Sequence, residues 1–289
     1  MFLELSFDLG ALDPEAAEDA GFACGACAVT FEDARDDPVL EPMPGEVRLW
    51  PATRVRCLFA DEAPPRLAEM LAAALGLQPA ELSARPVADR AWEREWLRDL
   101  HAMRFGRRLW VCPRHEQVTE PGAVVVRLDP GLAFGTGTHA TTALCLEWLD
   151  AHLSPGTCVI DYGCGSGILG VAAARLGASA VHGFDIDPQA LTATRDNAEV
   201  NDVMARVRLH ESAATLPREA DLLVANILAG TLCALAPSLA GRLRRGGHIV
   251  LAGLLAHEVA DVTEAYAPCF DVGRAGERDG WVCLAGRRR

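Results

Sequence analysis

The first 88 residues alternate apolar and polar positions in short runs that are separated by turn residues. Residues 2–9 alternate as a half-buried strand does, and Asp13 with Pro14 provides a capping side chain and a proline at the start of a short helix. The whole pattern predicts a strand, a helix, two strands, a helix and a strand, over residues 2–9, 13–22, 26–33, 55–60, 65–77 and 82–88. This β-α-β-β-α-β order predicts a small α+β unit of the split βαβ, ferredoxin-like type.

Residues 89–106 carry Trp92, Trp96, Leu97 and Leu100 at helical spacing. We expect a connecting helix that packs by this apolar face, rather than a ligand-stacking role for either tryptophan. The predicted organisation is therefore a small α+β domain, a linker helix and a larger domain, over residues 1–88, 89–106 and 107–289.

From about Leu144 onward, short apolar runs alternate with helical patterns. The runs predict strands over residues 158–163, 180–185, 206–211, 220–228 and 248–255. Alternation of this kind is typical of an α/β domain with a doubly wound, mainly parallel sheet. The last segment, 268–287, predicts two strands around a turn at Asp279-Gly280, which would place an antiparallel strand in the sheet. That arrangement is common in methyltransferases and uncommon in dinucleotide-binding domains.

The composition is that of an ordinary enzyme of the cytoplasm. Half of the 289 residues are hydrophobic and 23% are charged. No apolar run approaches the ~20 residues of a membrane span, and no charged and then apolar leader opens the chain. Ten cysteines are scattered through predicted helices and strands, so we expect free thiols; Cys24 and Cys27 form a C-x-x-C pair that lacks the further ligands of a zinc site. We expect a monomer.

The charge is uneven along the chain. Through Arg90 there are 17 acidic and 7 basic residues, a balance of −10 out of a net charge of −13. An acidic amino-terminal third argues against direct binding to nucleic acid, because phosphate contacts need the opposite sign. It favours a basic protein partner, with a simple solvated acidic surface as the alternative. All 27 basic residues are arginine, so no lysine serves as a catalytic base or Schiff-base former.

A glycine-rich turn between a strand and a helix marks the candidate site. The segment 159–170, VIDYGCGSGILG, runs from a buried strand into a helix, and Asp185 follows at the end of the next predicted strand. This is the pattern of a nucleoside-cofactor cradle. Gly165, Gly167 and Gly170 satisfy the G-x-G-x-x-G dinucleotide fingerprint, with Asp185 where a ribose-binding acid belongs.

Asp161 favours a different cofactor. It precedes Gly163 by two residues, at the strand end where a dinucleotide would place its pyrophosphate, and two like charges at short range are unfavourable. S-adenosylmethionine carries a sulfonium and an ammonium, which a nearby carboxylate favours directly or through water. Glycines such as Gly163 and Gly165 allow the backbone to approach the cofactor, and Asp185 would accept hydrogen bonds from the ribose hydroxyls. A tight turn without a ligand is the alternative.

Asn226 lies near the carboxyl end of the fourth predicted strand of the larger domain, and strand ends of open α/β sheets converge on the site. Its amide can accept a hydrogen bond from a substrate N–H, helped by an adjacent backbone carbonyl, and so aim the nitrogen lone pair at the cofactor's methyl group. A helix N-cap is the alternative role.

Residues 129–150 form a second unusual segment, with Gly131, Gly135 and Gly137 before a predicted helix. We expect this loop to touch the cofactor or to move as a lid. Hydroxyls between Thr138 and Thr142 could cap the helix or meet the cofactor's carboxylate, and the role of His139 is left open.

Together these segments resemble the PrmA family, bacterial methyltransferases of large-subunit ribosomal protein eleven. The resemblance spans almost the whole chain, in HAMRFGRRLWVCP, LDPGLAFGTGTHATTALCLEWLD, VIDYGCGSGILGVAAARLGA, DIDPQAL, VANILAG and WVCLAGRR. It implies a class I S-adenosylmethionine-dependent fold for residues 107–289, with cofactor contacts at Thr142, Gly163, Asp185 and Asn226. It also implies a substrate-recognition domain over 1–88, a linker that lets the domains reorient, and methylation of lysine ε-amines and an α-amine.

This chain departs from the family pattern in having Ala140 where proline is usual, and the amino-terminal region matches more weakly. The alternatives are a lysine methyltransferase that acts on another protein, an NAD(P)-dependent oxidoreductase, and a binding module with an inactive methyltransferase fold.

Overall fold

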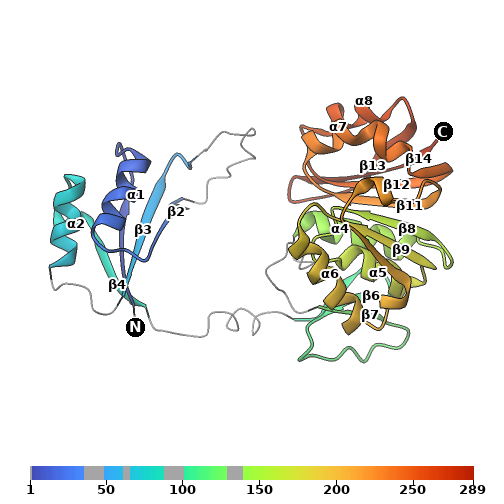
Figure 1. Ribbon diagram of the computed structural model, residues 1–289, viewed down its shortest axis with the longest axis horizontal. Helices are drawn as coiled ribbons and strands as arrows, with labels where there is room; N and C mark the ends of the chain where they lie inside the picture. Colours follow the sequence, from blue (N-terminus) through green and yellow to red (C-terminus); the bar gives the residue numbers. More distant parts are fainter. Residues whose placement is uncertain (1, 36–48, 61–65, 88–100, 129–138) are drawn as a thin grey trace. The chain divides into compact units, whose positions relative to one another are not determined.

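The computed structural model describes residues 2–35, 49–60, 66–87, 101–128 and 139–289. The chain divides into two compact units, Met1–Trp92 and Glu93–Arg289, which are coloured from blue to cyan and from green to red in Figure 1. None of the helices in the described ranges combines the length and the apolar character that a membrane-spanning helix needs.

The first unit has the predicted split βαβ fold. Its elements are β1 (Phe2–Asp8), α1 (Pro14–Ala23), β2 (Ala28–Asp33), β3 (Thr53–Ala60), α2 (Leu67–Leu75), the 3-10 helix η1 (Pro79–Glu81) and β4 (Ser83–Val87). The sheet order is β2-β3-β1-β4, and each neighbouring pair is antiparallel. Alternate residues of the strands point to the two faces, so that Leu5, Cys57 and Phe59 are buried in a core with Leu67 and Leu71 of α2.

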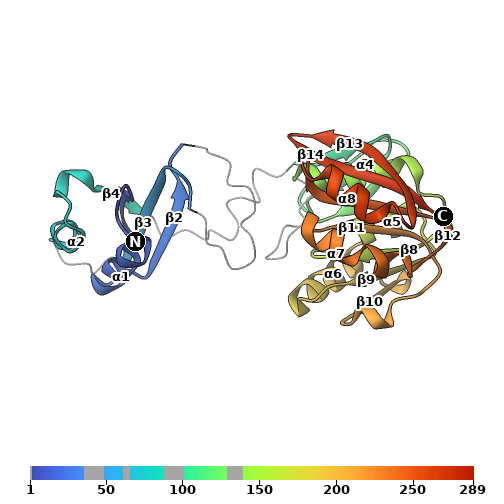
Figure 2. The same cartoon turned by 90° about the horizontal axis from the view of Figure 1, so that it is seen from above.

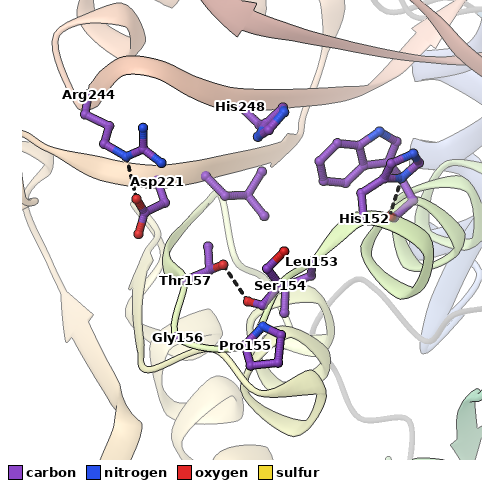
Figure 3. Close-up of a pocket in the computed structure, with 11 residues that line it drawn as sticks. His152, Leu153, Ser154, Pro155, Gly156, Thr157, Asp221, Arg244 and His248 are labelled. Carbon is purple, nitrogen blue, oxygen red and sulfur yellow. Dashed lines mark hydrogen bonds and ion pairs between the residues drawn. The ribbon is translucent and has the colours of Figure 1, made fainter.

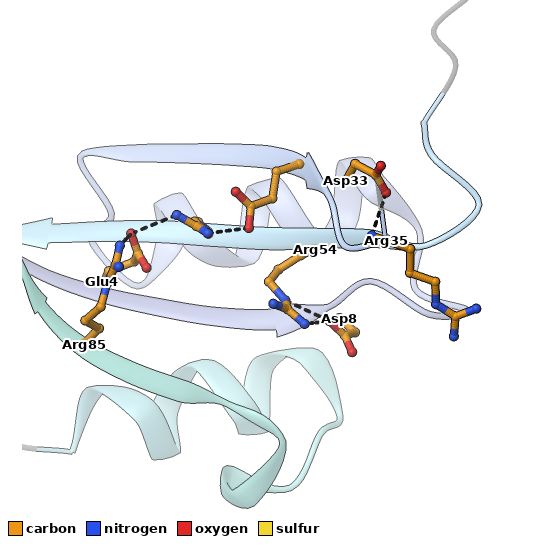
Figure 4. Close-up of polar contacts among 8 residues, drawn as sticks. Glu4, Asp8, Asp33, Arg35, Arg54 and Arg85 are labelled. Atoms are coloured by element: carbon orange, nitrogen blue, oxygen red, sulfur yellow. Dashed lines mark hydrogen bonds and ion pairs between the residues drawn. The ribbon is translucent and has the colours of Figure 1, made fainter. Parts of the chain in front are cut away.

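The polar residues of these strands form ion pairs between neighbouring strands (Figure 4). The pairs are Arg54 with Asp8, Arg56 with Glu4 and with Glu32, and Arg85 with Glu4. Because all of the arginines are more than one-third exposed, each pair contributes little to stability.

The second unit opens with a three-stranded sheet, β5 (Met103–Phe105), β6 (Leu109–Cys112) and β7 (Val124–Arg127), where the sequence predicts the end of the linker helix. The predicted helix is therefore wrong at residues 103–105. Phe105 is buried in the core, Gly106 lies at φ +70°, and the carboxylate of Asp150 accepts a hydrogen bond from the Arg107 amide at 2.6 Å. These interactions stabilise a β5-β6 hairpin. The remainder of the linker prediction, with both tryptophans, lies largely in 88–100, outside the described residues.

The rest of this unit is an α/β domain, as predicted. Its elements are α4 (Ala140–His152), β8 (Cys158–Tyr162), α5 (Ile168–Leu176), β9 (Ala180–Phe184), α6 (Pro188–Val200), η3 (Met204–Arg206), β10 (Val207–His210), η4 (Ala213–Thr215), β11 (Ala220–Asn226), α7 (Ala229–Ala240), β12 (Leu243–Leu255), α8 (Val259–Tyr266), β13 (Phe270–Arg278) and β14 (Trp281–Arg288). The seven-stranded sheet has the order β10-β9-β8-β11-β12-β14-β13, and Figure 2 shows it from above.

β14 runs antiparallel to both of its neighbours and lies between β12 and β13, so the predicted terminal hairpin is confirmed. Asp279 and Gly280 both have positive φ, which is the backbone of a tight hairpin turn. Successive residues of a strand point to opposite faces of the sheet, and each face has its own hydrophobic core. Val159 packs in the core with α4 and α5, and Ile160 packs in the core with α7 and α8. The carboxyl ends of the parallel strands are thereby held at one edge of a sheet that is buried on both faces.

Candidate functional site

The candidate site lies where β8, β9 and β11 end. The ladder pairs Tyr162 with Phe184 on one side and with Ala225 on the other. One residue further along these three strands stand the predicted site residues Gly163, Asp185 and Asn226. The fold therefore brings together three positions that lie far apart in the sequence.

The turn after β8 requires glycine for conformational and for steric reasons. Gly163, Gly165 and Gly167 have φ values of +77°, +54° and +76°, in the left-handed region. A Cβ atom at Gly163 would lie 2.5 Å from Cγ2 of Ile227, and one at Gly167 would collide with the side chain of Thr194. Gly167 is also the N-cap of α5 and offers no side chain to its first amides. The turn thus presents open backbone at a helix N-terminus, as a polar ligand requires.

Asp185 ties the end of β9 to this turn. Its Oδ2 accepts a hydrogen bond from the amide of Gly165 at 2.9 Å, and its Oδ1 accepts one from the amide of Asp187 at 3.0 Å. Each carboxylate oxygen has two lone pairs, so both oxygens keep capacity for further donors. This is the acceptor that ribose hydroxyls would need.

Asp161 lies beneath the turn and is 1% exposed. Its Oδ2 accepts a hydrogen bond from the amide of Gly170 at 2.8 Å, whereas its Oδ1 is buried and has no hydrogen-bond partner among the described residues. Burial raises the pKa of Asp161 to about 7, the Gly170 hydrogen bond opposes this rise, and the charge of Asp185 adds to it. A buried carboxylate with an unused oxygen favours a cationic group nearby, so the residues present fit an ammonium-bearing cofactor.

Asn226 is the last residue of β11, and its Nδ2 donates to Oγ1 of Thr142 at 3.3 Å. Helix α7 begins at Ala229 and its N-cap is Leu228, so the alternative role of Asn226 as a helix cap is wrong. Thr142 is buried on the first turn of α4. The two residues thus connect the end of β11 to the helix that follows the glycine-threonine segment.

His139 is the N-cap of α4, which the sequence left open. Its Nδ1 accepts from the Thr141 amide and lies 2.8 Å from the Thr141 hydroxyl, and its ring meets the edge of Trp281. An imidazole therefore occupies this cap, which was one of the two roles that the sequence allowed for the hydroxyls between Thr138 and Thr142. Gly131, Gly135, Gly137 and Thr138 lie outside the described residues.

Two apolar residues at this edge were not singled out from the sequence. Ile186 directly follows Asp185 and is 89% exposed, and Leu228 stands two residues after Asn226 and is 53% exposed. Single exposed apolar side chains are ordinary on protein surfaces, so it is the position of these two beside the candidate site that sets them apart. The sequence carries a signal for Ile186, which stands between Asp185 and Asp187 at a strand end, whereas Leu228 follows Ile227 in one apolar run.

The cavity shown in Figure 3 does not lie at the candidate site. It has a volume of about 290 Å³ and lies at the amino ends of β8 and β11, lined by residues such as Thr157, Asp221 and His248. Ligands of open α/β sheets bind at the carboxyl ends of the strands, so this cavity is not the candidate active site.

Comparison with known proteins agrees with this geometry. The family described as "Ribosomal protein L11 methyltransferase (PrmA)" matches residues 1–289. The protein named ribosomal protein L11 methyltransferase in Erwinia tasmaniensis is 46% identical over 301 residues, which cover 100% of this chain and 99% of that protein. Its namesake in Pseudomonas aeruginosa is 50% identical over 284 residues, covering 96% and 97% of the two chains.

Among solved structures, the ribosomal protein L11 methylase of Lactobacillus delbrueckii subsp. bulgaricus is 33% identical, with a TM-score of 0.61. The match covers 66% of this chain and 100% of that chain. The resemblance in the sequence is thereby confirmed, and the assignment decides against a dinucleotide-dependent oxidoreductase. This chain belongs to the PrmA family of ribosomal protein L11 methyltransferases, enzymes that use S-adenosylmethionine as methyl donor.

Proposed function

We propose that this protein transfers methyl groups from S-adenosylmethionine to lysine ε-amines and an α-amine of large-subunit ribosomal protein eleven. The observation that carries the proposal is the convergence of the Gly163 turn, Asp185 and Asn226 at one sheet edge, in a chain that matches the family from end to end. The bound cofactor supplies an electrophilic methyl group on a sulfonium.

The cofactor-binding residues of this proposal are Thr142, Asp161, Gly163, Gly165, Asp185 and Asn226. Asp185 would accept hydrogen bonds from the ribose hydroxyls while it holds the Gly165 amide. Gly163 and Gly165 would let the backbone approach the amino-acid and ribose parts, where a Cβ atom would interfere. Asp161 would place a negative charge near the ammonium, and Thr142 would set the orientation of Asn226.

Asn226 would orient the acceptor amine. Because its Nδ2 donates to Thr142, its Oδ1 remains to accept an N–H of the substrate and to direct the nitrogen lone pair at the methyl group. The amine must arrive neutral, and burial on docking lowers a lysine pKa from its usual value of about 10.4. Alignment and exclusion of water then supply most of the rate, without a strong general base.

We further propose that the acidic amino-terminal domain, residues 1–88, recognises the ribosomal protein and that residues 89–106 let it reorient relative to residues 107–289. Its balance of −10 through Arg90 favours a basic protein partner over nucleic acid. The protein is proposed to act as a monomer in the cytoplasm.

The affinity for S-adenosylmethionine should fall as the pH is lowered through 7. In the free chain the pKa of Asp161 is raised to about 7, so the carboxyl takes up a proton below that pH, whereas a bound ammonium favours the ionised form. We expect about tenfold weaker binding at pH 6 than at pH 8, measured by titration calorimetry. Asp161→Asn keeps an acceptor for the Gly170 amide but cannot ionise. An equally steep pH dependence in this variant would exclude Asp161 as the titrating group.

The target is tested by exposing the whole set of large-subunit ribosomal proteins to the enzyme and methyl-labelled S-adenosylmethionine. We expect label on ribosomal protein eleven, with fragment mass spectra that place it on lysine side chains and on the α-amine. Label confined to a different protein would instead favour the alternative of a lysine methyltransferase with another substrate.

A further inference from the structure

Ile227 lies between the glycine turn after β8, residues 163–167, which we call the cofactor turn, and a bulge in β12. It follows Asn226 directly, and its amide donates to the carbonyl oxygen of Ala252 at 3.1 Å. Asn226 is itself paired with Ala252 in the β11–β12 ladder. The backbone that leads away from Asn226 is therefore held against β12.

The bulge makes this approach possible. The register between β12 and β14 shifts between Leu251 and Leu254, and Gly253 lies there at φ +88°. A Cβ atom at Gly253 would collide with the carbonyl oxygen of Ile227 and lie 2.9 Å from its carbonyl carbon and 3.1 Å from its nitrogen. Bulges beside active sites commonly re-aim neighbouring groups, and here the neighbour is the backbone next to Asn226.

The opposite side of Ile227 meets the cofactor turn. A Cβ atom at Gly163 would lie 2.5 Å from Ile227 Cγ2, which leaves room for a hydrogen only. The side chain of Ile227 thus contacts the turn, while its backbone contacts the bulge. One residue joins the cofactor site to the amide that would orient the amine.

We infer that Ile227 and Gly253 are positioning residues, which fix the Asn226 amide relative to the cofactor turn. Neither residue needs to touch the reacting atoms, because a displacement of about 1 Å in an aligned pair lowers the rate by about 100-fold. The inference rests on the proposed function, in which Asn226 orients the acceptor amine.

Gly253→Ala should displace the Ile227 backbone. We expect the single-turnover rate of methyl transfer to fall by about 10- to 100-fold, while the dissociation constant for S-adenosylmethionine changes by less than about threefold. Gly246→Ala is the matched control, since Gly246 lies on the same strand at φ +75° but its nearest neighbour, Arg244 Nη1, is 3.9 Å from the new Cβ. Both variants place alanine at a positive φ, so loss of rate in Gly246→Ala as well would overturn the inference.

A second set of variants tests the contact with the turn through cofactor binding alone. Gly163→Ala should weaken binding by about tenfold, in part through strain and in part through the collision with Cγ2 of Ile227. Adding Ile227→Ala removes that atom and should restore about threefold of the loss, whereas Ile227→Val keeps Cγ2 and should restore none. Equal effects of the two Ile227 variants would overturn the contact.

This second experiment needs no methyl acceptor, so it separates two kinds of failure. If the wild-type chain binds the cofactor but does not methylate ribosomal protein eleven, the proposed target is wrong. The recovery of cofactor binding in the Gly163→Ala/Ile227 double variants still tests the Gly163–Ile227 contact. In that case the NMR resonances of the Asn226 side-chain amide test the role of the bulge. They should shift in Gly253→Ala and stay in place in Gly246→Ala. Unchanged resonances in both would overturn the role of Gly253.

Discussion

Replacing Asn226 by alanine should lower kcat for methyl transfer by about 100-fold or more, by analogy with the loss of other positioning groups. The variant loses the only side-chain acceptor that we assign to the substrate N–H, whereas the Gly163 turn and Asp185 remain. We therefore expect a smaller change in the dissociation constant of S-adenosylmethionine. Single-turnover rates with ribosomal protein eleven, together with calorimetric binding of the cofactor, measure the two quantities separately.

Thr142 provides a matched pair of controls for this prediction. Thr142→Ser keeps the hydroxyl that accepts from Asn226 Nδ2, and Thr142→Val keeps the shape but removes the acceptor. In Thr142→Val the Asn226 amide loses the hydroxyl that orients it, so we expect kcat to fall by about tenfold. In Thr142→Ser the hydroxyl is kept, and we expect kcat to change little. Unchanged turnover in Asn226→Ala would contradict the orienting role altogether.

Asp185→Ala should weaken the binding of S-adenosylmethionine by about 100-fold. Two charge-assisted hydrogen bonds to ribose hydroxyls are worth about 3 kcal/mol together, and the Gly165 amide loses its acceptor in the same substitution. At saturating cofactor, kcat should change much less, since the acceptor side of the site is intact. Titration calorimetry on the full chain measures the affinity.

The control for Asp185 is its neighbour Asp187, which caps α6 by accepting from the Gln189 amide at 2.8 Å. Asp187→Ala should cost about 1 kcal/mol of stability through the lost cap and leave cofactor affinity within about twofold. If both variants weakened binding alike, local unfolding rather than lost ribose contacts would explain the effect.

Local patterns sufficed to predict most of the fold. Each local pattern predicts the backbone conformation of its own residues. The structure has strands where residues 2–9 alternate and where residues 220–228 form an apolar run, and a turn at Asp279-Gly280. The failure at 103–105 has a physical cause. The helical spacing of apolar residues was extended into a segment where Gly106 and the distant Asp150 stabilise a hairpin. The hydrogen bond from the Arg107 amide to Asp150 joins segments far apart in the sequence, so no local pattern predicts it.

In the candidate site, too, some features follow from local sequence and others depend on contacts between distant segments. Asp185 and Asn226 were recognisable because strand ends of parallel sheets meet at one edge. The burial of Asp161, the cap formed by His139 and the contact of Gly253 with Ile227 depend on packing between segments that are distant in sequence. A positive φ at Gly253 cannot be read from its neighbours, since glycine is compatible with every backbone region.

Intact-mass spectrometry measures methyl transfer to ribosomal protein eleven without a label or a coupled reaction. The isolated ribosomal protein is incubated with the full chain and S-adenosylmethionine, and its mass is followed over time. We expect successive increases of one methyl group, which disappear when S-adenosylmethionine is omitted. A ribosomal protein whose mass stays unchanged, in the presence of a chain that binds the cofactor, would contradict the proposed function.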